Sequence, residues 1–343
     1  MKKLKIAQLA PLWEQVPPKT YGGIERVVSD LTENLVSLGH NVTLFASGDS
    51  ETKAKLDVTY PRAIRLDPKV KASTPIELLH ACRVFERAGE FDIIHNHMGH
   101  LGIPFSGFVK TPVLTTMHSI FPPEHSMLFR HFKSQPYVSI SNNQRGGLPE
   151  LNYVATVYNG INMNLYKFNP KPKNYLLFMG RSSPLKGPHL AIAVAKKVGM
   201  KLILASKVDP GDREYHRKYV QPHIDGKQIV FKGELNDAQR VSLYENAFAT
   251  LFPIQWREPF GLVMTESMAC GTPVVALRNG SVPEVIKSGK TGFICRNVQE
   301  MAKSVSKINT ISREACRKHV DENFSVSQMI DGYLRVYEKL IKK

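Results

Sequence analysis

The sequence has 343 residues, of which 42% are hydrophobic and 22% charged, and these are the proportions of ordinary globular domains. No stretch approaches the ~18 consecutive apolar residues of a membrane-spanning helix, and Gln8 and Pro11 interrupt the apolar run 6–12, which argues against a signal peptide. The length predicts two domains. Four scattered cysteines without a C-x-x-C pair are expected to be free thiols in a reducing cytoplasm.

The formal net charge is +16, which raises nucleic acids, anionic membranes and anionic substrates as binding partners. Residues 1–170 contain 18 basic and 14 acidic side chains, whereas residues 171–343 contain 28 and 16, so the two parts carry +4 and +12. We interpret most of this excess as solvated surface, and its location favours an anionic ligand for the second half.

Strand-like apolar runs alternate with helix-like ones from the N-terminus onward. The first half predicts strands at 5–10, 41–47, 63–66, 92–96, 113–118 and 138–141, with helices at 24–38 and 75–88. The pattern restarts with strands at 175–179, 201–206, 229–232, 249–252, 272–277 and 292–295, and an amphipathic helix is predicted at 326–341. Short apolar strands joined by helices predict parallel sheets that are covered on both faces. The segment 167–174, with two prolines and several charges, is predicted to be the interdomain linker.

The most informative motif is the segment WREPFGLVMTE at 256–266, which places seven residues between Glu258 and Glu266. Gly261 precedes a predicted helix at 262–269, and free backbone N–H groups at Phe260–Leu262 are typical of an anion site. Glu266 lies about one turn inside the helix, where a carboxylate can accept from two vicinal hydroxyls. A diphosphate flanked by two sugars fits this layout. The alternative is a pair of solvated glutamates.

Three further motifs bear on ligand binding. The segment FMGRSSPLKG at 178–187 joins a strand to a helix and carries Arg181 and Lys186, the arrangement with which open α/β sheets bind phosphates. Gly22 and Gly23 follow the first strand and open the first helix, where missing side chains allow a ligand to approach the backbone. His118 ends a predicted strand. Each of these is also compatible with an ordinary turn or a structural histidine.

Together with these motifs, six other segments resemble landmarks of the family 4 retaining glycosyltransferases, which have the GT-B fold. They are YGGIE at 21–25, TTMH at 115–118, VSIS at 138–141, YNGI at 158–161, GTPVVA at 271–276 and GSVPE at 280–284. The resemblance spans nearly the whole chain, and the Glu-x7-Glu element with Arg181 and Lys186 upstream is its most specific part. The segments 10–23 and 44–50 look most similar to the branch of antibiotic-tailoring and pteridine glucosyltransferases.

The resemblance implies an α/β protein of the GT-B fold, with two Rossmann-like parallel-sheet domains that face a cleft. An acceptor-binding domain is expected at 1–168 and a donor-binding domain at 172–323, with a C-terminal helix at 324–343 that crosses back to the first domain. The implied activity is retaining transfer of a hexose from a nucleotide diphospho-sugar, such as UDP-glucose, to a hydroxyl acceptor. The implied catalytic residues are Glu258, His118, Arg181 and Lys186, and the implied donor-binding residues are Gly22, Gly23, Arg181, Lys186, Phe260, Gly261, Leu262 and Glu266.

No metal or cofactor is expected. His95, His97 and His100 are spaced like metal ligands, yet no nearby cysteine or paired carboxylate completes a site, and we place them on the acceptor side of the cleft. The chain has no Asp-x-Asp, so Arg181, Lys186 and helix amides are expected to meet the donor charge.

The expected partners are the nucleotide sugar and a small-molecule or glycan acceptor in the cytoplasm. Nucleic acid is not expected, because aromatic residues do not interleave with the basic ones. The first half has only a modest basic run between Lys53 and Lys71, so contact with a membrane is not favoured. The alternatives are a catalytically silent or RNA-binding GT-B protein and a GT-B sugar-nucleotide epimerase or phosphorylase.

Overall fold

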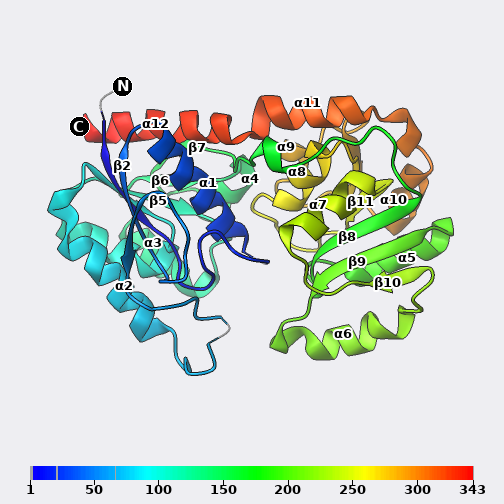
Figure 1. The fold of residues 1–343 in the computed structure, drawn as a ribbon, viewed down its shortest axis with the longest axis horizontal. Helices are drawn as coiled ribbons and strands as arrows, with labels where there is room; N and C mark the ends of the chain where they lie inside the picture. Colours follow the sequence, from blue (N-terminus) through cyan, green and yellow to red (C-terminus); the bar gives the residue numbers. More distant parts are fainter. Residues whose placement is uncertain (1–2, 21, 66, 343) are drawn as a thin grey trace. The chain divides into compact units, whose positions relative to one another are not determined.

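The structure is a computed structural model that describes residues 3–20, 22–65 and 67–342. The chain forms two compact units, of which Met1–Gly160 with Val326–Lys343 make up the first and Ile161–Ser325 the second. Each unit contains one parallel sheet with helices packed around it (Figure 1). The predicted α/β class with two parallel sheets is therefore confirmed.

The sheet of the first unit has the strand order β3-β2-β1-β4-β5-β6-β7, and all neighbouring strands are parallel. The strands are β1 (Lys5–Leu9), β2 (Asn41–Ala46), β3 (Lys55–Val58), β4 (Ile93–Asn96), β5 (Val113–Met117), β6 (Tyr137–Ser139) and β7 (Tyr153–Thr156). The α-helices are α1 (Gly23–Ser37), α2 (Thr74–Glu86), α3 (Ser126–His131), α4 (Asn142–Arg145) and α12 (Val326–Ile341). Because the strand order reverses at β1, the carboxyl ends of β1 and β4 form a switch point of the kind where open sheets bind ligands.

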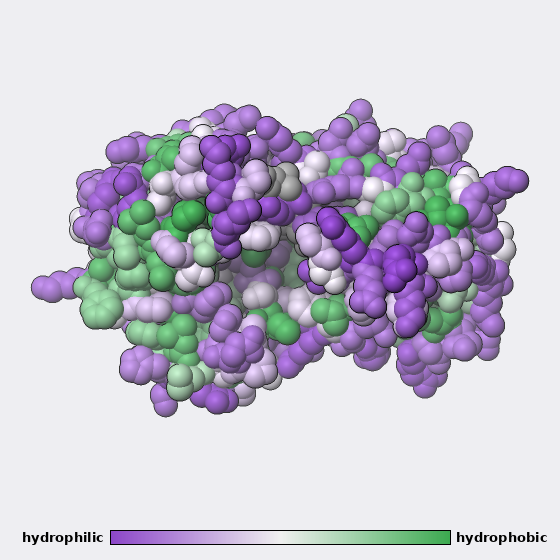
Figure 2. Space-filling model, turned by 90° about the horizontal axis from the view of Figure 1, so that it is seen from below, coloured by the Kyte–Doolittle hydropathy of each residue, from purple (hydrophilic) through white to green (hydrophobic). Residues whose placement is uncertain are grey.

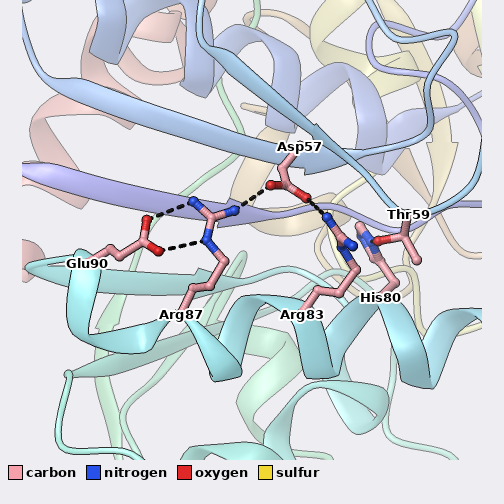
Figure 3. A network of polar contacts seen from close by, with 6 residues as sticks. All are labelled: Asp57, Thr59, His80, Arg83, Arg87 and Glu90. Atoms are coloured by element: carbon pink, nitrogen blue, oxygen red, sulfur yellow. Dashed lines mark hydrogen bonds and ion pairs between the residues drawn. The ribbon is translucent and has the colours of Figure 1, made fainter.

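The edge strands of this sheet differ from the prediction. Residues 63–65 form no strand, and Leu66, the last residue of the predicted strand, lies outside the described residues. The strands β3 and β7 were not predicted, because edge strands are only half buried and lack the continuous apolar run of a central strand. Polar contacts also hold β3: Asp57 accepts from Arg83 of α2 and from Arg87, which directly follows this helix (Figure 3).

The helix α12 has the bounds that the amphipathic pattern predicted, and it begins where the chain returns to the first unit, as the family resemblance implied. Its buried face consists of Val326, Met329, Ile330, Tyr333, Leu334, Val336, Tyr337 and Leu340. Tyr333 reaches Thr116 of β5 at 3.2 Å, and Tyr337 reaches His95 of β4 at 2.7 Å. The helix thus completes the core of a unit from which it is separated by 165 residues of sequence.

The sheet of the second unit has the order β10-β9-β8-β11-β12-β13 and is also entirely parallel. The strands are β8 (Tyr175–Arg181), β9 (Lys201–Lys207), β10 (Ile229–Phe231), β11 (Ala249–Phe252), β12 (Val274–Leu277) and β13 (Gly292–Cys295). The helices are α5 (Pro188–Val198), α6 (Arg213–Tyr219), α7 (Asp237–Asn246), α8 (Leu262–Ala269), α9 (Val282–Val285), α10 (Val298–Val305) and α11 (Arg313–Phe324). Here the order reverses at β8, so the carboxyl ends of β8 and β11 form the second switch point.

The division between the units lies earlier than the predicted linker, which the sequence placed at 167–174. The guanidinium of Arg317 donates to the carbonyl oxygens of Tyr166 and Ala269 at 2.7 and 2.6 Å, and Arg313 donates to that of Asn169 at 2.6 Å. These bonds attach 166–169 to α11 of the second unit. The position of this boundary depends on arginine side chains that lie 144 and 151 residues further along the sequence, so the local composition of 167–174 does not indicate it.

In the part of the chain that the structure describes, no helix has both the length and the apolar character to cross a membrane. Figure 2 shows one face of the molecule, on which hydrophilic residues predominate and apolar residues gather in separate patches. The four cysteines are free thiols, three of them buried.

Candidate functional site

The loop between β11 and α8 holds Glu258 at the second switch point. Gly280 approaches its backbone so closely that a Cβ at position 280 would lie 2.3 Å from both the nitrogen and the oxygen of Glu258. Ser281 donates its backbone N–H to the same carbonyl at 3.0 Å. Gly261, at the start of α8, has φ of +81°, a conformation that favours glycine. The predicted glycines at 261 and 280 therefore fix the backbone that presents Glu258.

The carboxylate of Glu258 is paired on one oxygen. Its Oε2 accepts from Nζ of Lys186 at 2.6 Å and from the indole N–H of Trp256 at 2.7 Å. The Lys186 ammonium also lies 5.2 Å from the centroid of the Trp256 ring, within the range of a cation–π contact. Glu258 is 8% exposed, and within the described ranges no hydrogen bond reaches its Oε1. The pair is thus pre-organised, with one carboxylate oxygen left for a ligand.

Lys186 comes from the loop after β8, as the motif predicted. Gln255 donates its backbone N–H to the carbonyl of Leu185 at 2.8 Å, which ties this loop to the loop of Glu258. Gly187 packs against Pro253, where a Cβ would lie 2.3 Å from the carbonyl oxygen. The two loops follow neighbouring strands, so the sheet brings together two residues that are 72 positions apart.

Arg181 lies at the end of β8 and pairs with other residues. Its guanidinium lies 3.2 Å from a carboxylate oxygen of Asp212 and 3.7 Å from one of Asp209. Lys207 pairs with Asp209 at 2.9 Å. The prediction that Arg181 and Lys186 share a diphosphate site stays a prediction, because each cation has a different carboxylate partner.

Glu266 lies on the buried side of α8, next to α7. Its Oε1 accepts from the hydroxyl of Tyr166 at 3.1 Å and pairs with Arg240 at 3.3 Å, and its Oε2 accepts from Tyr244 at 2.9 Å. Burial, together with the Glu266 carboxylate, raises the pKa of Tyr244 well above its ordinary value. Three of about four acceptor positions of the carboxylate are therefore used inside the protein. The predicted two-oxygen contact with a ribose diol needs some of these partners to give way.

The other residues predicted near the start of α8 have different roles in the structure. Phe260 is 2% exposed, and its ring packs edge to face on Phe324 at 5.7 Å between centroids. α8 begins at Leu262, so the free N–H groups of a helix start are those of its first turn. The Phe260 ring thus packs in the interior, and the predicted anion contact of the backbone at Phe260, Gly261 and Leu262 stays a prediction.

In the first unit, Gly22 precedes α1 and Gly23 opens it, as predicted. The sequence reasoning assigned no role to Glu25, which lies on the buried face of α1 and is 4% exposed. Burial, with a further contribution from Glu14, raises the pKa of Glu25 to about 7. Glu25 lies one turn before Val28 and two turns before Thr32, and both of these residues are buried. This helical spacing is the signal that could have indicated that Glu25 is buried as well.

A cavity of about 220 Å3 opens at the carboxyl ends of β1, β4 and β5. Histidines contribute much of its polar lining, namely His97, His100, His118 and His125. Apolar side chains, including Met98, Met117, Ile24 and Phe129, make up most of the remainder. Of the three histidines predicted for the acceptor side, His97 and His100 line this cavity together with His118, whereas His95 is not among the lining residues.

His95 of β4 and His97, which follows this strand, take part in buried hydrogen bonds. His95 contacts Tyr337 and Thr116, and His97 contacts Gln8 and His118. Desolvation lowers the pKa of His95 and His97 well below the ordinary value and that of His118 to about 4. Among the described residues, no three histidine, cysteine or acidic side chains are grouped as metal ligands.

The comparison with protein families covers both halves of the chain. Residues 21–165 match the family described as Glycosyltransferase Family 4, and residues 166–323 match Glycosyl transferases group 1. The glycogen synthase of Mycobacterium tuberculosis is 25% identical over 86% of this chain and 84% of its own. The glycosyltransferase YtcC of Bacillus subtilis, itself described as putative, is 23% identical over 96% of this chain and 91% of its own.

Solved structures of glycosyltransferases share the fold. AviGT4, a glycosyltransferase involved in avilamycin A biosynthesis, superposes with a TM-score of 0.77 at 24% identity and covers 99% of this chain and 98% of its own. Sucrose-phosphate synthase from Thermosynechococcus elongatus superposes with a TM-score of 0.81 at 19% identity, over 99% and 100% of the two chains. The chain therefore belongs to the family 4 glycosyltransferases, and it is a transferase with the GT-B fold.

Proposed function

We propose that the protein is a retaining hexosyltransferase that uses a nucleotide diphospho-sugar, with UDP-glucose as the first candidate, and a small hydroxylated acceptor. The observation that carries the proposal is the Lys186–Glu258–Trp256 group at the switch point of β8 and β11. Related folds have been solved with such ligands: HepE of Anabaena with UDP-glucose, and Starch Synthase IV of Arabidopsis thaliana with ADP and acarbose.

The chemistry assigned to this group is electrostatic. When the anomeric C–O bond to phosphate breaks, negative charge grows on the leaving group, and a fixed ammonium such as Lys186 stabilises it more in the transition state than in the ground state. Arg181 supplies a second cation if it moves from Asp212 to the phosphate. Glu258 accepts from a sugar hydroxyl through Oε1 and favours the positive charge that develops at the anomeric carbon. No nucleophilic side chain is assigned, and the leaving phosphate oxygen takes the proton of the acceptor hydroxyl.

The cavity of the first unit is proposed as the acceptor site. Its volume of about 220 Å3 suits a small molecule or one sugar residue. Its mixture of imidazoles and apolar side chains, together with the carboxylate of Glu77, favours an acceptor without negative charge that has both a hydrophobic part and hydroxyl groups. The four free thiols fit a reducing compartment, which supports action in the cytoplasm.

A donor screen tests the proposal directly. The wild-type protein is incubated with a panel of UDP-, ADP-, GDP- and TDP-sugars, and release of the nucleotide is measured, first with water and then with a library of small hydroxylated acceptors and glucan oligosaccharides. NMR of the product gives its anomeric configuration. A retaining transfer predicts the same anomeric configuration in the product as in the donor. Nucleotide release that requires Lys186 supports the proposal, and an inverted product contradicts the retaining assignment.

The alternatives separate in the same screen. An epimerase converts one nucleotide sugar into another without releasing nucleotide, and a phosphorylase requires inorganic phosphate. A silent, RNA-binding GT-B protein binds RNA in a parallel titration and turns over no donor. If turnover occurs only with glucan oligosaccharides, the acceptor is a glucan and not a small molecule.

A further inference from the structure

A chain of hydrogen bonds leads from the cavity of the first unit into its core. Nε2 of His118 lies 2.9 Å from Nδ1 of His97, and Nε2 of His97 lies 2.8 Å from Oε1 of Gln8. The two imidazole rings stack with their centroids 5.2 Å apart. Gln8 is fully buried in the central strand β1, and His97 is 3% exposed. Of these three hydrogen-bonded residues, His118 and His97 line the cavity.

Gln8 determines which atom donates and which accepts in each hydrogen bond of this series. An amide oxygen can only accept, so Nε2 of His97 must carry a hydrogen and donate it. Because burial lowers the pKa of His97 and His118, both rings are neutral near pH 7 and each carries one hydrogen. Nδ1 of His97 is therefore an acceptor, and Nε2 of His118 must donate to it. Nδ1 of His118 is left with a bare lone pair, and no described residue hydrogen-bonds to it.

The hydrogen bonds on the other side of Gln8 hold its side-chain amide in place. Nε2 of Gln8 donates to the hydroxyl of Tyr337 at 3.2 Å, and this hydroxyl lies 2.7 Å from Nδ1 of His95. His95 continues through Nε2 to the hydroxyl of Thr116 at 2.7 Å. Each of these side chains is buried, so solvent cannot supply replacement bonds. The orientation of Gln8 is thus fixed by groups on β4, β5 and α12.

We infer that Gln8 and His97 are positioning residues that hold His118 as its Nε2–H tautomer, so that the cavity presents Nδ1 as an obligatory hydrogen-bond acceptor and selects a ligand with an O–H or N–H group there. A ligand that places a carboxylate, phosphate or ether oxygen at this point meets a lone pair and is disfavoured. The identity of the ligand rests on the proposed function, which places the acceptor in this cavity and so makes the group a hydroxyl of the acceptor. The tautomer itself does not depend on that function.

The tautomer is measured by NMR on the full chain with ¹⁵N-labelled histidine. Two-bond ¹H–¹⁵N correlations distinguish a protonated from an unprotonated ring nitrogen, and His118→Gln and His97→Gln assign the signals. At about pH 7.5 we expect both rings in the Nε2–H form in the wild type. Gln8→Leu removes the acceptor that sets the direction, so His118 should become a mixture of tautomers. Tyr333→Phe removes a buried hydroxyl that contacts Thr116 and leaves the bonds of Gln8 intact, so His118 should keep the wild-type form.

Two spectroscopic outcomes overturn the inference: a wild-type His118 protonated on Nδ1, or a Gln8→Leu spectrum identical to the wild type. If Gln8→Leu does not fold, Gln8→Met replaces it, and the wild-type spectrum decides on its own whether Nδ1 is bare.

Ligand selection is tested with an acceptor from the screen and its monodeoxy analogues. In the wild type, one of the analogues should bind at least about tenfold more weakly than the parent acceptor, and Gln8→Leu should reduce that difference. A difference that is equal in the two proteins overturns the role in selection. If the screen yields no turnover, the proposed function fails, and the tautomer result still decides on the positions of Gln8, His97 and His118.

Discussion

Nζ of Lys186 lies 2.6 Å from Oε2 of Glu258, at the point where two loops from neighbouring strands of the second unit meet. The pair is largely buried, with 22% of the lysine side chain and 10% of the glutamate side chain exposed. A buried charge pair is costly to assemble, and it is held here by Trp256 and by the backbone of Gly280. We therefore expect this pair to serve catalysis.

Lys186→Ala should lower kcat by at least ~100-fold with a smaller change in KM, because the ammonium acts mainly on the charge of the leaving phosphate. Glu258→Gln keeps the size and loses the charge, so it should also lower kcat more than it raises KM. Steady-state kinetics with the donor from the screen measure both. Lys318→Ala, which removes an exposed lysine of the same unit, is the control and should leave kcat within about twofold. If Lys186→Ala and Glu258→Gln mainly raise KM, the pair binds the donor equally well in the ground state and the transition state and does not lower the barrier.

Arg181→Ala should also lower kcat by at least ~100-fold if the guanidinium moves from Asp212 to the donor phosphate. Asp212→Asn then provides the matched test, because it weakens the pair that competes with the phosphate. Asp212→Asn should lower the KM for the donor and leave kcat nearly unchanged. Equal losses of kcat in the two variants would mean that the Arg181–Asp212 pair is structural.

Glu266→Ala should weaken UDP binding by about 1–3 kcal/mol through the lost ribose contact. It should also destabilise the second unit by about 3–5 kcal/mol, because it removes the buried carboxylate partner of the largely buried Arg240 and leaves it only the exposed Asp237 at 3.6 Å. Urea unfolding and calorimetric titration with UDP measure the two effects separately. Tyr166→Phe, which removes one hydroxyl bond to the same carboxylate, should cost about 1 kcal/mol of stability. Unchanged UDP affinity in a folded Glu266→Ala protein would contradict the nucleotide role.

Turnover should survive chelation, because the sequence has no Asp-x-Asp and the cations Arg181 and Lys186 are expected to meet the donor charge. The measurement is nucleotide release with EDTA present and then with added manganese or magnesium. Complete loss of activity in EDTA that either metal restores would show that the reaction needs a divalent cation.

Glu25 should make the first unit lose stability as the pH rises from 4.5 to about 7. Its folded pKa of about 7 lies above the ordinary 4.5, so the stabilisation is complete below pH 4.5 and is lost as the pH rises through 7. Glu25→Gln should therefore gain up to about 3 kcal/mol over the wild type between pH 4.5 and 8, measured by urea unfolding.

His80 provides the internal control for this measurement, because its shift has the opposite sign. Burial lowers the pKa of His80 from 6.5 to about 4, so its stabilisation is present above pH 6.5 and is lost as the pH falls towards 4. Its ring bonds to Thr59, as Figure 3 shows, and to the carbonyl of Ala10. The two pH windows overlap with opposite sign, so the difference in stability between Glu25→Gln and the wild type at each pH isolates the contribution of Glu25. A difference that stays constant between pH 4.5 and 8 would assign the pH dependence to another group.

The central strands and the long helices could be predicted because their signals are local. Parallel strands covered on both faces appear as short apolar runs, and the predicted strand at 249–252 and helix at 326–341 have the bounds of β11 and α12. The Glu-x7-Glu element and the strand-to-helix turn of Lys186 are local as well, and they indicated the family. The edge strand β3 escaped prediction because charged contacts from α2 hold it, and these depend on residues that are distant in sequence.

The sequence by itself indicated the fold class and the family, and it predicted Lys186 and Glu258 as site residues, because each has a short-range pattern. Only the tertiary structure decided the partners: Lys186 with Glu258, Arg181 with Asp212, and Glu266 with Tyr166, Tyr244 and Arg240. It also decided the direction of the bonds from Gln8 to His118. The physical reason is that hydrogen bonds and ion pairs act over about 3 Å in space, and the packing of sheets and helices brings residues from distant parts of the chain to that distance.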